Sequence, residues 1–81
     1  MKVKVLLFAD LREVAGQGEL ALELPEGSTV GGMLRAIEGI YPALAGRLPQ
    51  VKVAVGRRLA GPEAVIRPGE EVALLPPVGG G

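Results

Sequence analysis

The chain has 81 residues, with nine basic and nine acidic side chains, one Phe, one Tyr, and neither Cys nor His. This length fits one domain with a small core, while the zero net charge and scarce aromatics argue against binding to nucleic acid or to an anionic membrane. Without Cys or His, the chain has no disulfide, no thiolate or imidazole metal site, and none of the usual nucleophilic triads. We therefore expect no metal, no permanently bound cofactor and no independent enzyme, and the lack of cysteine fits a cytoplasmic protein.

The first third of the chain has the period of two that is typical of strands. Alternation of apolar and polar residues predicts strands at 2–9 and 19–24, joined as an antiparallel hairpin. The long connection, residues 10–18, is expected to be a loop with at most one helical turn around 11–14.

One amphipathic helix follows. Apolar residues recur at helical spacing from Val30 for about three turns. Ser28 or Thr29 can cap its N-terminus, and Pro42 ends it. Residues 43–50 are expected to be irregular.

The last third of the chain has three further strand patterns, at 51–55, 57–60 and 71–75. Gly56 permits a tight turn between the first two, and Pro76-Pro77 ends the ladder after the third. The order ββαβ(β)β predicts an α+β domain with a mixed sheet of four or five strands. The main helix covers one face of this sheet and leaves the other face open.

The chain closes with three glycines, Gly79-Gly80-Gly81, after the stiff Pro76-Pro77 segment. Glycine has no side chain to pack and is costly to order, so we expect a domain at 1–77 and a flexible tail at 78–81. A slender tail of this kind fits a narrow channel in another protein, where its terminal carboxylate can be activated with AMP and converted to a thiocarboxylate. A frayed end without function is the alternative.

Four apolar residues are candidates for a docking surface. Leu6, Phe8 and Leu75 fall on the predicted open face, close to the root of the tail, and Leu59 extends this surface. Scattered surface apolars are the alternative interpretation.

Most of the chain resembles the small subunit of molybdopterin synthase, the MoaD family of ubiquitin-like sulfur carriers. The similar segments are, in chain order, FADLRE at 8–13, LPEGSTV at 24–30, YPAL at 41–44, VAV at 53–55 and PGEEVALLPPV at 68–78. Gly56 replaces the family's usual Asn, and Gly79 replaces a frequent Ser, but the final pair Gly80-Gly81 is intact.

The resemblance implies a β-grasp fold and a site at the end of the chain. A ubiquitin-activating-type adenylyltransferase would adenylate Gly81 with ATP and Mg²⁺, and a sulfur donor protein would supply the sulfur of the thiocarboxylate. Val78, Gly79 and Gly80 would then thread into the large catalytic subunit of molybdopterin synthase, a heterotetramer, to build the molybdopterin dithiolene. Three alternatives remain: a related carrier for tRNA thiolation or thiamine thiazole synthesis, a covalent protein modifier, and a non-catalytic interaction module.

Overall fold

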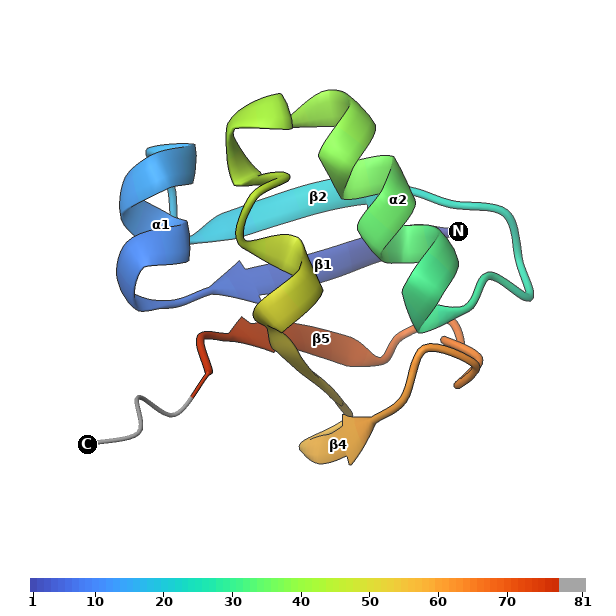
Figure 1. The fold of residues 1–81 in the computed structure, drawn as a ribbon. Coiled ribbons are helices and arrows are strands. Elements are labelled where there is room, and N and C mark those ends of the chain that lie inside the picture. The colour runs from blue at the N-terminus through green and yellow to red at the C-terminus, as the bar shows by residue number, and fades with distance from the viewer. Residues whose placement is uncertain (78–81) are drawn as a thin grey trace.

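The computed structural model describes residues 1–77, so the predictions for Val78, Gly79, Gly80 and Gly81 lie outside the described residues. The elements are, in chain order, β1 (Lys2–Leu7), α1 (Ala9–Ala15), β2 (Glu19–Glu23), α2 (Val30–Ile40), the 3₁₀ helices η1 (Pro42–Leu44) and η2 (Leu48–Gln50), β3 (Lys52–Val55), β4 (Arg58–Ala60) and β5 (Glu71–Leu75) (Figure 1). This order confirms the predicted α+β class, with one main helix, α2. Within residues 1–77, none of the helices has the length and apolar character needed to cross a bilayer.

The five strands form one mixed sheet in the order β2-β1-β5-β3-β4. Only β1 and β5 are parallel; each of the other neighbouring pairs is antiparallel. The parallel pair brings the carboxyl ends of the first and last strands to the same edge of the sheet, with Leu7 opposite Leu74. The segment that follows β5 therefore starts beside the end of β1.

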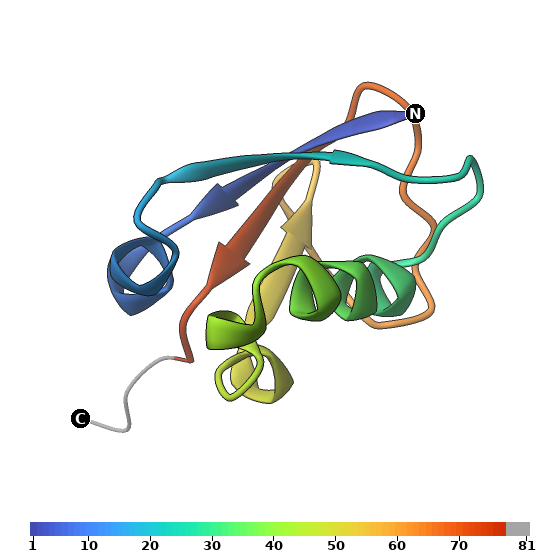
Figure 2. The same ribbon diagram turned by 90° about the horizontal axis from the view of Figure 1, so that it is seen from above.

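The core lies between the sheet and α2. Alternate residues of β1, β2 and β5 are buried, and they pack against the apolar stripe of α2 that contains Val30, Met33 and Ile37. Figure 2 shows α2 and the 3₁₀ helices gathered on one side of the sheet. The strands thus fold with one face covered and one face open, as their alternation predicts.

Thr29 is the residue that caps α2. The backbone N–H of Gly32 donates a hydrogen bond to Thr29 Oγ1 at 3.1 Å, which satisfies one free donor of the first turn. The hydroxyl of Ser28 donates instead to the carbonyl of Pro25 at 2.6 Å. Of the two predicted caps, the structure uses Thr29 for the helix and Ser28 for the preceding turn.

The loop after β4 also packs on the start of α2. The N–H groups of Val30 and Gly31 donate to the carbonyls of Ala64 and Pro62, each at 2.9 Å. A Cβ on Gly31 would lie 3.3 Å from the Pro62 oxygen, so this close approach favours glycine. The first N–H groups of α2 are therefore used inside the fold.

The prediction of a loop with one helical turn at 10–18 was wrong, because α1 is a helix of seven residues. Leu11 anchors α1 in the core at 1% exposure, and Gly16 closes it in the left-handed conformation, donating to the carbonyl of Arg12. The backbone turns at Ala9, where φ is 51°, so β1 ends at Leu7 rather than at residue 9.

The other differences concern short segments. Residues 43–50, expected to be irregular, contain most of η1 and η2, which place Leu44 and Leu48 in the core. β3 and β4 each begin one residue later than predicted. Gly56 and Arg57 form the turn between them, with φ values of 57° and 70° that match a two-residue type I′ hairpin.

Candidate functional site

The open face is the side of the sheet opposite α2, and a row of apolar side chains crosses it. Leu6 of β1 pairs with Ala73 of β5, Ala73 pairs with Ala54 of β3, and Ala54 pairs with Leu59 of β4. Directly opposed side chains in a sheet lie about 5 Å apart and on the same face. The row therefore has a leucine at each end and two small alanine side chains between them.

A second apolar group lies at the end of the sheet where β1 and β5 finish. Phe8 follows β1 in extended conformation and is 43% exposed, so the alternation of the strand continues and places it on the open face. Leu75 is half-buried on the same face. The parallel register, with Leu7 opposite Leu74, places Phe8 and Leu75 at neighbouring positions.

The structure thus brings three of the four docking candidates together. Leu6, Phe8 and Leu75 share the β1–β5 end of the open face, whereas Leu59, which is 69% exposed, lies at the far end of the row. The two alanines, Ala54 and Ala73, were missed by sequence reasoning. Their small side chains carry no signal of their own, and only the cross-strand register shows that they connect the leucines.

Sequence reasoning also missed one charge beside this surface. Lys52, which is exposed, pairs with Leu75 and so stands beside the root of the tail. The opposite end of the open face is polar, and Lys4 Nζ lies 4.0 Å from Glu19 Oε1 there. The open face therefore has an apolar half near the end of β5, with Lys52 and Glu19 at its margins, and a charged half at the opposite end.

The segment after β5 leaves the sheet from the apolar half. β5 ends at Leu75, and the two prolines at 76 and 77 lack the N–H groups needed to extend the ladder. Figure 1 shows the chain leaving the sheet at the end nearer α1, the helix that follows Phe8. The predicted tail is thus rooted beside the apolar group.

Within the described range, no three acidic side chains gather as a metal site would require. The side chains of the open face are aliphatic, aromatic or singly charged, and they form a contact surface rather than a cluster of acids and bases. A surface of this kind is suited to binding another molecule.

Comparison with known proteins identifies the family of the chain. The sequence model of the ThiS family matches residues 5–81. The molybdopterin synthase sulfur carrier subunit of Chlamydomonas reinhardtii is 36% identical over 83 residues, covering 100% of both chains.

Two solved structures share the fold. Small archaeal modifier protein 1 of Haloferax volcanii superposes with a TM-score of 0.87 at 33% identity, covering 95% of this chain and 98% of that one. The Amycolatopsis orientalis BexX/CysO complex contains a chain that superposes with a TM-score of 0.72 at 28% identity, covering 98% and 99%. These similarities confirm the β-grasp, ubiquitin-like architecture. The chain belongs to the ThiS family and is a relative of the molybdopterin synthase sulfur carrier subunits.

Proposed function

We propose that this protein is the sulfur-carrier subunit of a molybdopterin synthase and that it works through the carboxylate of Gly81. The observation that carries the proposal is the parallel pairing of β1 with β5. It places Leu6, Phe8 and Leu75 at the edge of the sheet from which Pro76-Pro77 lead toward the final glycines. The proposed recognition surface thus lies beside the root of the proposed reactive tail.

The proposed chemistry needs no catalytic side chain from this chain. A carboxylate is a poor acyl donor, so a ubiquitin-activating-type adenylyltransferase joins Gly81 to AMP at the expense of ATP, with Mg²⁺ and release of pyrophosphate. Sulfide supplied by a donor protein then attacks the acyl carbon, AMP leaves, and a thiocarboxylate remains. This thiocarboxylate donates sulfur for the dithiolene inside the large subunit. The absence of His and Cys from the sequence agrees with this division of labour.

The apolar half of the open face would bind the large subunit while Val78, Gly79 and Gly80 enter its channel. An exposed aromatic beside half-buried leucines is a suitable anchor, since aromatic side chains are enriched among the residues that dominate binding energy. The structure of a related chain in the BexX/CysO complex supports a function in a complex. We place the protein in the cytoplasm, in a heterotetramer with two small subunits at the ends of a large-subunit dimer.

A second candidate function is covalent modification of proteins, in which activated Gly81 forms an isopeptide bond with a lysine. The similarity to small archaeal modifier protein 1 favours this candidate. Carriers for tRNA thiolation or thiamine thiazole synthesis would use the same activated end. All of these share the first step, adenylation of Gly81, and differ in what accepts the acyl group or the sulfur.

Intact-mass measurement tests the proposal. We expect incubation with the cognate adenylyltransferase, ATP, Mg²⁺ and a sulfur donor to replace one oxygen of the chain by sulfur. Deletion of Gly80 and Gly81 should abolish this change and leave the melting temperature nearly unaltered, because glycine has no side chain to contribute to a core. Gly46→Ala is the folded control, since a Cβ there meets no atom within 4 Å.

An unchanged mass of the full-length chain under these conditions would contradict the proposal and favour an inert interaction module. Conjugates of higher mass that retain Gly81 would identify a modifier. A large loss of thermal stability on deletion would instead make the glycines part of the fold.

A further inference from the structure

A second apolar surface lies on the helix side of the sheet. A hollow of about 520 Å³ opens between α2, η2 and the β3–β4 hairpin, within the roughly 300–1,000 Å³ range of binding pockets. Its lining includes Val30 and Leu34 of α2, Leu48 and Pro49 of η2, and Leu59 and Ala60 of β4. Lys52 is its one charged lining residue.

The hollow continues along α2. A smaller hollow of about 170 Å³ shares Leu34, Leu48 and Pro49 with it and extends to Arg35 and Glu38. We refer to the two together as the α2–β4 groove. Because the two hollows adjoin along α2, the groove suits an extended segment of polypeptide better than a compact ligand.

The strand beside the groove has a free edge. β4 is an edge strand of the sheet, and among residues 1–77 it pairs only with β3. Val55 and Arg58 flank the two-residue hairpin turn, so these two residues form the hydrogen-bonded pair of the ladder. The next pair, Ala54 and Leu59, is not hydrogen-bonded, and Leu59 therefore directs its N–H and C=O away from β3. These two backbone groups can accept a further strand at the rim of the groove.

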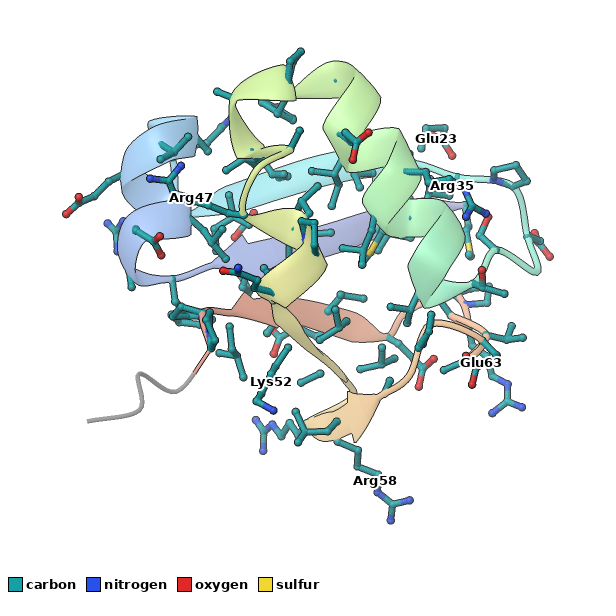
Figure 3. The ribbon with its side chains drawn as sticks, viewed as in Figure 1. Glu23, Arg35, Arg47, Lys52, Arg58 and Glu63 are labelled. Atoms are coloured by element: carbon teal, nitrogen blue, oxygen red, sulfur yellow. The ribbon has the colours of Figure 1, made fainter. Side chains whose placement is uncertain are left out.

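The charge around the groove is positive on the β-strand side. Lys52 and Arg58 are exposed, and neither takes part in any ion pair formed within residues 1–77. Figure 3 shows both side chains projecting from β3 and β4 into solvent. No carboxylate lines the main hollow; Glu63 stands at its rim beside Gly61, away from β3, and Glu38 lies at the far end of the smaller hollow. An occupant with acidic side chains would therefore be favoured.

We propose that the α2–β4 groove binds an extended, acidic and aliphatic segment of a partner protein, which adds to the free edge of β4. Its backbone bonds to Leu59, its aliphatic side chains rest on Leu34 and Leu48, and its carboxylates face Lys52 and Arg58. This is strand addition combined with pockets for alternate side chains. Leu59 and Lys52 border both this groove and the open face, but Leu6, Phe8 and Leu75 are not among the residues that line the groove. The groove therefore provides a contact beyond the one proposed for sulfur transfer.

A second copy of this chain is a poorer occupant. Each copy exposes Arg57 and Arg58 beside the free edge of β4, so pairing β4 with β4 of another copy would bring two positively charged edges together. Like charges at short range oppose such pairing. A segment of opposite charge has no such penalty.

The test uses an acetylated and amidated octapeptide, Asp-Glu-Val-Ile-Val-Leu-Asp-Asp, titrated into the full-length ¹⁵N-labelled protein. β-branched residues favour the extended conformation, and the acids supply the complementary charge. We expect amide resonances of Leu59, Ala60 and Leu34 to shift, and the affinity to fall as salt is added. A peptide with Lys in place of each acid should not bind.

Three matched pairs of variants identify the contacts. Leu34→Gln should weaken binding about tenfold, whereas Ile40→Gln, on the exposed end of the same helix, should not. Arg58→Glu should weaken it comparably, with Arg67→Glu as control. Leu59→Pro removes the outward N–H as well as the side chain, so it should weaken binding more than Leu59→Ala.

Thermal melts verify that each variant is folded. Shifts confined to Leu6 and Ala73, or equal binding by the acidic and basic peptides, would overturn the proposal. So would dimerisation of the protein through Leu34 and Leu59 in sedimentation experiments, because the groove would then belong to a second copy.

Discussion

The two faces of the sheet are built from the same strands and have different environments. On the covered face, Leu7 and Leu74 are almost completely buried beneath the helical layer. One residue away along the same strands, Leu6 and Leu75 are only half-buried on the open face. The sequence supplies leucine to both faces, so hydrophobicity alone does not distinguish a residue that stabilises the fold from one that is available to a partner.

The two faces of the sheet differ in whether another layer of the fold covers them. The buried leucines of the covered face belong to one core cluster with residues of α2 and the 3₁₀ helices, whereas the open face has no layer of its own within residues 1–77. Small domains bury a limited share of their surface, and apolar area left on one face is available for association. The comparison predicts that mutations on the two faces will affect different measurements.

The largest effect is expected at Leu74. Leu74→Ala should reduce the free energy of unfolding by about 3 kcal/mol, because it leaves a cavity at a site with 0% exposure. Leu75→Ala, the adjacent residue on the open face, should cost about 1 kcal/mol or less. Urea denaturation measures both. Equal losses would show that the open face also contributes to the core.

The next effect concerns binding rather than stability. Phe8→Asp should weaken the proposed complex with the large subunit of a molybdopterin synthase by about 2 kcal/mol, as expected for loss of an aromatic anchor. Phe8 is the N-cap residue of α1 and makes no side-chain cap bond, so Asp there can cap the helix and preserve the fold. Isothermal titration calorimetry measures the affinity.

Ala21→Asp is the matched control for this binding experiment. Ala21 pairs with Lys4 in the charged half of the open face, and its substitution should leave the affinity nearly unchanged. If Phe8→Asp binds as tightly as the unmodified protein, the apolar half of the open face is not the docking surface.

Loss of the N-terminal cap of α2 should have a smaller effect on the free energy of unfolding. Thr29→Ala should lower the free energy of unfolding by about 1 kcal/mol, because the N–H of Gly32 loses its capping oxygen. Ser28→Ala should cost less, since the Ser28 hydroxyl bonds a turn carbonyl outside the helix. Chemical denaturation of the two variants compares them. A reversed order would assign the cap to Ser28.

The smallest effect is expected at the surface. Arg47 Nε lies 2.9 Å from Asp10 Oδ2, and both side chains are about half exposed. Exposed ion pairs of this kind contribute about 0.5 kcal/mol or less. Arg47→Ala should therefore shift the melting temperature only slightly, and the shift should shrink further in high salt. A loss comparable to that of Thr29→Ala would mean that this pair helps to hold α1 in place.

Local sequence predicted a large part of the fold. The alternation at 71–75 predicted β5 with its observed bounds, and the spacing from Val30 with Pro42 predicted α2. It failed at α1, where a helix of seven residues depends on burying Leu11 beneath the rest of the chain. A short helix with one buried anchor has too weak a periodic signal to be distinguished from a loop.

For the candidate site, the sequence by itself determined which residues are apolar, which strand carries each of them, and that glycines follow the last strand. Only the tertiary structure decided that β1 and β5 are parallel neighbours, that Ala54 and Ala73 connect Leu6 to Leu59, and that Lys52 stands beside Leu75. Strand alternation is a local property with a period of two residues, whereas register joins segments far apart in the chain. The pairing of distant strands depends on how the whole core packs, and no short window of sequence contains that information.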